Sequence, residues 1–228
     1  MRSHSRSRQI AVALALFAAS APYVSAQTPA KPPLLELVKL PELVPTAKLI
    51  EKLEAGGNIL LIRHERTEVP SVADDYAKPT DDCRTQRNLS AAGFAGAAET
   101  RTVLRALKIR VQRVLSSPMC RATETARQMF VSYQIEPRLM HEMDDQGRTN
   151  DVAGADLKAV LQGLGSSTDN IALVTHAGLI QRATGLSLPE GGIAILRREM
   201  DGRLILVKQI MGSDLGPHAR EALGPVTP

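Results

Sequence analysis

Aromatic residues are scarce in this sequence. Of its 228 residues, 3% are Phe, Trp or Tyr, and Trp is absent. Proteins that bind single-stranded nucleic acids stack the bases on aromatic side chains. The composition therefore argues against such a platform, and equally against an aromatic platform for carbohydrates.

Metal-binding motifs are missing as well. The two cysteines, Cys83 and Cys120, do not have the spacing of a CxxC redox or zinc motif. Zinc binding by His64, His141 and His176 is conceivable, but no HExxH or comparable spacing supports it. We therefore expect no metal and no other cofactor.

No apolar run reaches the ~20 residues that a membrane-spanning helix needs. The N-terminal run, residues 10–19, follows three arginines and precedes a small-residue site that ends at Ala26. This order is typical of a signal peptide at residues 1–26, so we expect a secreted or periplasmic protein, with an uncleaved anchor as the alternative. In an oxidising compartment, Cys83 and Cys120 most simply pair, and two separate buried thiols are the second possibility.

Little net charge remains once this segment is removed. The formal charge of +4 falls to +1, because residues 1–26 carry three arginines and no acidic residue (4 − 3 = 1). We therefore expect no nucleic-acid partner. The remaining chain suits one domain at 47–211, after a Pro- and Leu-rich arm or linker at 27–46 and before a flexible tail at 212–228.

The apolar pattern alternates between strand and helix. Strands are expected at 59–62, 110–116 and 171–175, and helices at 47–55, 91–107, 118–130 and 154–164, with Ser90 and Ser117 as N-caps. Two further β segments, 192–196 and 203–210, flank a turn at Asp201-Gly202. This order predicts an α/β fold with a mostly parallel central sheet, helices on both faces and the C-terminal β segments at the sheet edge.

Basic or hydroxyl side chains follow each of the three predicted strands: Arg63-His64, then Ser116-Ser117-Pro118 with Arg121, then His176. Because the carboxyl ends of parallel strands share one edge, we expect them to converge there, beside a helix N-terminus that also favours anions. Arginine forks match phosphate oxygens, and a neutral imidazole attacks phosphorus. A single residue of this kind is more often solvated. The prediction of a phosphoryl-transfer site therefore depends on the occurrence of such residues at all three strand ends.

These residues resemble the motifs of the histidine phosphatase superfamily, which has the phosphoglycerate-mutase-like fold. The resemblance covers about residues 47–211. It implies that His64 is the nucleophile, that Arg63 and Arg121 bind phosphate, and that His176 completes the pocket as a catalytic and phosphate-binding residue. The residues that carry the resemblance are Leu61-Ile62-Arg63-His64, Ser116-Ser117-Pro118, Arg121-Ala122, Thr125-Ala126, Val174-Thr175-His176, and Gln86-Arg87-Asn88-Leu89-Ser90 followed by Gly93.

Two residues depart from the pattern of that family. Glu65 stands where Gly or Ala usually follows the nucleophile, and Arg66 stands at the usual Glu. Glu65 could narrow the pocket, repel a phosphate dianion or point outward, and Arg66 could add a phosphate contact. Ala177 follows His176 where the acid-phosphatase and phytase branch has Asp, which disfavours that branch.

The general acid is expected after the second motif. By the resemblance, Glu142 is the first candidate and Asp144 the second, and Glu190 is a third. Each could equally be a solvated loop carboxylate.

The sequence thus predicts an exported, metal-independent phosphatase that cleaves a phosphomonoester through a phosphohistidine on His64. Its substrate would be a phosphorylated small molecule or an envelope glycan, and the exported form with two cysteines is similar to a periplasmic subgroup that includes lipopolysaccharide-core phosphatases. A non-catalytic phosphate-ligand binder on the same fold is the alternative, ahead of a mutase or a structural envelope protein. A Cys83–Cys120 bridge would fasten the loop at 65–88 to the helix start that carries Arg121.

Overall fold

The computed structural model describes residues 37–39, 44, 46–69, 73–78, 80–140 and 150–223. The expected signal peptide, most of the expected arm, and three residues named above, His141, Glu142 and Asp144, lie outside these ranges. None of the described helices is long and apolar enough to cross a membrane.

The described residues form one seven-stranded sheet in the order β1-β7-β6-β2-β5-β3-β4. Its strands are β1 (Leu37–Lys39), β2 (Asn58–Arg63), β3 (Val111–Ser116), β4 (Gln134–Ile135), β5 (Asn170–Thr175), β6 (Gly192–Arg198) and β7 (Leu204–Met211). The helices are α1 (Thr46–Ala55), α2 (Ala91–Ala106), α3 (Cys120–Met129), α4 (Asn150–Gly163), α5 (Ala177–Thr184) and α6 (Gly216–Leu223), with 3₁₀ turns η1 (Cys83–Thr85), η2 (Pro137–Leu139) and η3 (Gly212–Leu215).

The sheet is mostly parallel, as the sequence predicts. Strands β2, β5, β3 and β4 run parallel to one another, and β6 runs antiparallel to both β2 and β7. The C-terminal strands therefore extend the sheet beyond β2. The edge next to β7 is taken by β1, which comes from the expected arm and pairs in parallel with β7.

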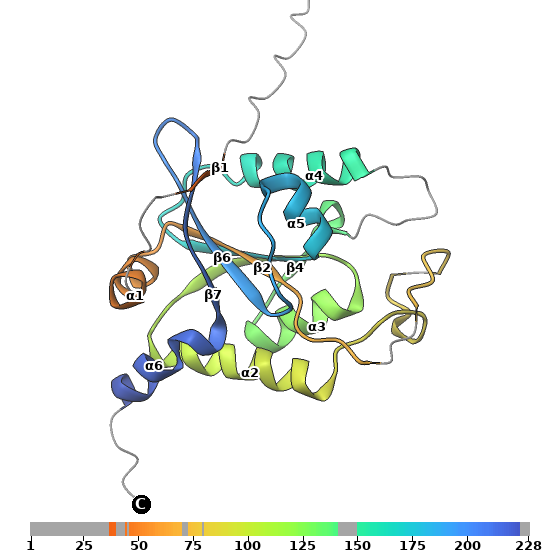
Figure 1. Ribbon diagram of the computed structural model, residues 1–228, viewed down its shortest axis with the longest axis horizontal. Coiled ribbons are helices and arrows are strands. Elements are labelled where there is room, and N and C mark those ends of the chain that lie inside the picture. Colours follow the sequence, from red (N-terminus) through yellow and green to blue (C-terminus); the bar gives the residue numbers. More distant parts are fainter. Residues whose placement is uncertain are drawn as a thin grey trace, which may run out of the picture. The chain divides into compact units, whose positions relative to one another are not determined.

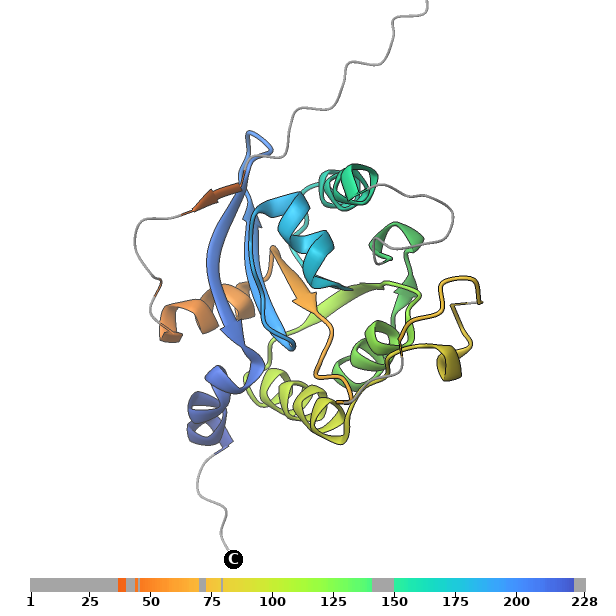
Figure 2. The ribbon, with the colours of Figure 1, turned by 45° about the vertical axis from the view of Figure 1, so that its right-hand side comes forward.

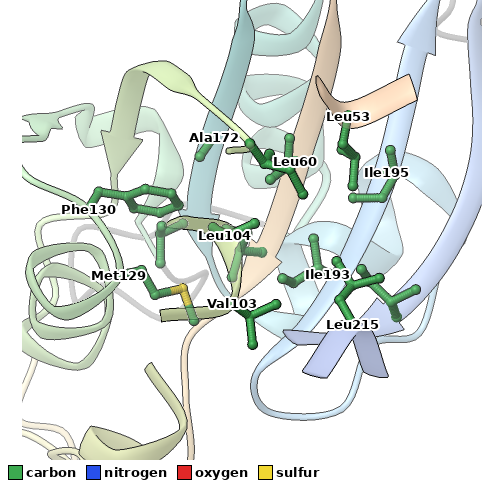
Figure 3. Packing of buried hydrophobic residues seen from close by; sticks show 14 of the residues in the cluster. Leu53, Leu60, Val103, Leu104, Met129, Phe130, Ala172, Ile193, Ile195 and Leu215 are labelled. Carbon is green, nitrogen blue, oxygen red and sulfur yellow. The ribbon is translucent and has the colours of Figure 1, made fainter. Parts of the chain in front are cut away.

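Helices cover both faces of the sheet (Figures 1 and 2), because alternate residues of each strand point to opposite faces. In β2, Leu60 and Ile62 pack into a cluster with α1, α2, α3 and α6, and Figure 3 shows part of that cluster. The intervening Ile59 and Leu61 pack into a second cluster with α4 and α5. The sheet is thus buried on both sides, which explains the continuous apolar runs in its central strands.

The C-terminal segment differs from the expectation of a flexible tail at 212–228. Residues 212–223 form η3 and α6, and Leu215 and Ala219 are buried in the cluster beside α2. Gly212 permits this packing, since a Cβ there would lie 2.0 Å from the Thr100 hydroxyl oxygen. The prediction was wrong for these residues because a short helix with two buried apolar positions leaves little periodic signal.

Candidate active site

The sheet register brings the two histidines together. Arg63 of β2 is paired with Thr175 of β5, and the next residue of each strand is a histidine. The backbone N–H of His64 donates to the Thr175 carbonyl at 3.0 Å, and the ring centroids of His64 and His176 are 5.3 Å apart. The expected convergence of these two strand ends is therefore present.

The β3 end joins them from the other side of β5. The backbone N–H of Ser117 donates to the Val174 carbonyl at 2.9 Å. The Ser117 hydroxyl then forms a hydrogen bond of 2.8 Å with Nε2 of His176. Both groups are fully buried, so this contact fixes the orientation of the His176 ring.

His64 is held as a neutral imidazole. The residue is 2% exposed, and Nδ1 lies 2.8 Å from the backbone carbonyl of Glu65. Since a carbonyl oxygen accepts and cannot donate, Nδ1 carries the proton and Nε2 keeps its lone pair. Burial lowers the pKa of His64 to about 3, and the positive charges of Arg121, Arg63 and Arg87 add to this effect against the opposing hydrogen bond to the Glu65 carbonyl. At neutral pH the ring is therefore uncharged, with the Nε2 lone pair available.

Arg121 lies in the first turn of α3 and is fully buried. Its NH1 donates to Oδ1 of Asp74 at 2.9 Å. Its Nε and NH2, which lie along the other edge of the guanidinium, have no hydrogen-bond partner among the described residues. An unsatisfied buried donor pair is costly, and its fork geometry matches two oxygens of a phosphoryl group.

Arg63 is the second arginine at this edge. Its NH1 donates to the Leu188 carbonyl at 3.0 Å, and its NH2 lies 3.6 Å from Oε1 of Glu190. Its Nε is buried without a hydrogen-bond partner in the described part of the chain. Burial lowers the pKa of Arg63, although the Glu190 carboxylate counteracts this. The two arginines therefore both keep donor groups unused.

The start of α3 differs from the expectation. The helix begins at Cys120 after Met119, whose side chain makes no capping bond, so Ser117 is not the N-cap. The Ser117 hydroxyl accepts from the Met119 N–H at 3.2 Å, and the Cys120 N–H donates to the Gln86 side-chain oxygen at 2.9 Å. These two N–H groups, expected to help bind an anion, are thus already bonded within the protein.

Glu65, the residue after His64, is buried between two glycines. Its carboxylate fills the space left by two glycines, since a Cβ on Gly96 of α2 would lie 2.9 Å from a carboxylate oxygen and a Cβ on Gly191 would lie 2.7 Å from one. Burial raises the pKa of Glu65. Its backbone N–H donates to the hydroxyl of Thr125 at 2.9 Å. Arg66 is exposed. Glu65 is 3% exposed, so the possibility that it points outward was wrong.

One of the three candidate acids is described. Glu190 lies at the site, where its Oε1 accepts a hydrogen bond of 3.0 Å from the Thr67 hydroxyl and faces Arg63. Glu142 and Asp144 lie outside the described residues. No group of three or more His, Cys, Asp or Glu in the described part of the chain could hold a metal ion.

Residues 73–78 and 80–90, called here the anchored segment, supply contacts that the sequence did not reveal. The disulfide Cys83–Cys120 fastens the segment to the start of α3, as expected. Gln86 adds a second link through its bond to the Cys120 N–H, and Asp74 adds a third through Arg121. Asp74 and Gln86 had no assigned role because a loop's path is not encoded in local periodicity. In the sequence, the cysteine pair was the feature that indicated the contact between this segment and the start of α3.

No protein-family model matches this chain, and no curated protein matches it. Solved structures do. The protein histidine phosphatase SixA, determined with tungstate, is 19% identical, with a TM-score of 0.51 over 69% of this chain and 99% of its own. The alpha-ribazole phosphatase from Shigella flexneri is 18% identical, with a TM-score of 0.51 over 65% of this chain and 94% of its own.

A mycobacterial glucosyl-3-phosphoglycerate phosphatase is 17% identical, with a TM-score of 0.51 over 66% of this chain and 96% of its own. These neighbours are members of the histidine phosphatase superfamily. At such low identity the likeness establishes the fold alone. The chain therefore has the phosphoglycerate-mutase-like α/β fold of the histidine phosphatases.

Proposed function

We propose that the protein is a phosphatase of the histidine phosphatase superfamily that hydrolyses phosphomonoesters without a metal ion. The observation that carries the proposal is a neutral, buried His64 beside Arg121, whose Nε and NH2 are buried with no hydrogen-bond partner among the described residues. A nucleophile and an oxyanion fork are the two groups that phosphoryl transfer needs most. The phosphatase neighbours support this reading at a general level.

The reaction follows from the protonation state of His64. Its Nε2 lone pair forms a bond to phosphorus while the bond from phosphorus to the alcohol oxygen breaks, and a carboxylic acid transfers its proton to that oxygen. Arg63 and Arg121, with His176, stabilise the charge on the phosphoryl oxygens. Water then forms a bond to phosphorus as the N–P bond breaks, and the carboxylate left by the first step takes a proton from that water. This releases phosphate and restores both His64 and the acid.

Three carboxyl groups are candidates for the acid: Glu142, Asp144 and Glu190. An acid matters more for a poor leaving group than for a good one. Replacing the true acid by its amide should lower kcat about 10²–10⁴-fold with an alkyl phosphate and much less with p-nitrophenyl phosphate. Glu142→Gln, Asp144→Asn and Glu190→Gln, compared on both substrates, identify it; a loss equal on both substrates for all three would show that none is the acid.

The alternative, a non-catalytic phosphate binder, was motivated by Glu65 beside the nucleophile. The carboxylate of Glu65 is packed against Gly96 and Gly191 inside the protein, which gives this residue a packing role. It favours the enzyme.

We also propose that the protein is exported and cleaved near Ala26. The disulfide Cys83–Cys120 supports this, because such bonds persist in oxidising compartments. A phosphorylated small molecule or an envelope glycan is the substrate class proposed for that location. Cell fractionation with N-terminal sequencing of the mature protein tests the export.

Phosphate release from p-nitrophenyl phosphate in excess chelator tests the activity. We expect release by the wild-type protein and none by His64→Ala. Equal release by both proteins, or none by the wild type, would refute the phosphatase.

A further inference from the structure

A third arginine, Arg87, lies in the anchored segment and is linked to Arg121. The backbone N–H of Arg87 donates to Oδ1 of Asp74 at 2.8 Å, and the same oxygen accepts from NH1 of Arg121 at 2.9 Å. The two residues are thus joined through one carboxylate oxygen. The positive charge of Arg87 also contributes to lowering the pKa of Arg63 and the pKa of His64.

The three arginines differ in how their charges are paired. Arg63 faces Glu190, and Arg121 is paired with Asp74. Arg87 forms no salt bridge with any residue that the structure describes, and its Nε is buried with no hydrogen-bond partner there. A buried donor on an unpaired cation is costly unless a ligand completes it.

We propose that Arg87 is a third phosphate-binding arginine, which donates to an oxygen of the phosphoryl group that Arg121 and Arg63 also hold. This inference rests on the proposed function, since it concerns the same pocket. The two carboxylates, those of Asp74 and Glu190, balance the charges of Arg121 and Arg63. The charge of Arg87 remains, so the group has one net positive charge. The ligand it suits is a tetrahedral oxyanion carrying two negative charges, the form of a phosphomonoester at neutral pH.

The anchored segment explains how Arg87 is held in place. Cys83 lies four residues before it and is bonded to Cys120, the residue next to Arg121. The side-chain oxygen of Gln86, directly before Arg87, accepts a hydrogen bond from the Cys120 N–H. The side-chain nitrogen of Gln86 donates to the Thr80 carbonyl at 2.8 Å. These links tie the positions of Arg87 and Arg121 to one another.

The test is the affinity for inorganic phosphate, measured by calorimetry on the oxidised protein at low ionic strength. Arg87→Met should weaken binding about 10- to 100-fold, the range expected for losing one charge-assisted hydrogen bond. Arg87→Lys keeps the positive charge but lacks the guanidinium fork, so its phosphate affinity should lie between those of the wild type and Arg87→Met. Arg84→Met is the matched control: Arg84 lies on the same segment, its side chain is 89% exposed and it is paired with Asp82, so phosphate affinity should stay within about twofold.

The outcomes separate this inference from the proposed function. Phosphate binding by Arg87→Met within twofold of the wild type would overturn the role of Arg87 and leave the phosphatase untouched. Equal weakening by Arg84→Met would also overturn it, since the effect would then be one of general charge. A wild-type protein that releases no phosphate from p-nitrophenyl phosphate would refute the phosphatase. If the Arg87 variants still weaken the affinity for inorganic phosphate as expected, the phosphate site would be retained. Circular dichroism confirms folding, and Arg87→Lys supplies the answer if Arg87→Met does not fold.

Discussion

Two regions of the molecule meet at the pocket, and they are positioned by different means. The strand ends carry Arg63, His64 and His176, and β3 leads into Arg121; their places follow from the register of β2, β5 and β3. The anchored segment carries Asp74 and Arg87, and its place follows from a disulfide and a few side-chain bonds. Sheet pairing involves many backbone hydrogen bonds, whereas the segment depends on a handful of links. We therefore expect the strand ends to tolerate changes that displace the segment.

The largest effect should come from the strand-end group. Arg121→Met removes the fully buried guanidinium with its unused edge and should lower kcat/KM for p-nitrophenyl phosphate about 10³–10⁵-fold, the range for an arginine that stabilises transferring phosphoryl charge. Arg84→Met serves again as the exposed control. A loss below tenfold in Arg121→Met would mean that this edge does not hold the phosphoryl group.

The second effect concerns the burial of neutral His64. The unfolded chain takes up a proton near pH 6.5 and the folded protein only near pH 3, so the unfolded state binds more protons between these values. The free energy of unfolding should therefore fall as the pH decreases from 6.5, by at most ~5 kcal/mol. Urea titrations of the wild type and His64→Asn across this range measure the contribution.

His218→Asn, in α6, is the control for loss of a histidine elsewhere. The difference in unfolding free energy between the wild type and His64→Asn should shrink toward low pH. A constant difference from pH 7 to pH 4 would contradict a depressed pKa for His64.

The third effect breaks the anchored segment. In Cys83→Ser/Cys120→Ser the free energy of unfolding should fall by ~3–4 kcal/mol, because the disulfide restricts the unfolded chain. Phosphate affinity should fall as well, while slow phosphorylation of His64 persists. Unchanged phosphate affinity in this variant, once folded, would show that the segment does not shape the pocket.

The same contrast explains what the sequence could predict. Buried strands leave apolar runs and parallel strands share an edge, so Arg63-His64, Arg121 and His176 could be placed together without coordinates. The start of α3 was misplaced because Ser117 and Pro118 mimic a helix start, while the Ser117 hydroxyl bonds Met119 and His176. Asp74 and Arg87 act through the path of a loop, and only tertiary links define that path. Glu65 could not be oriented from sequence, since its niche is formed by two glycines distant in the chain.

In the proposed mechanism His64 becomes phosphorylated in every turnover. The most direct measurement mixes the oxidised protein with p-nitrophenyl phosphate in chelator, quenches it at alkaline pH within the first turnovers, and maps the modified peptide by mass spectrometry. We expect one phosphoryl group on His64 that is lost in acid, and none in His64→Ala. Phosphate release by a protein that carries no phosphoryl group on His64 under these conditions, or that carries it on another residue, would contradict this mechanism.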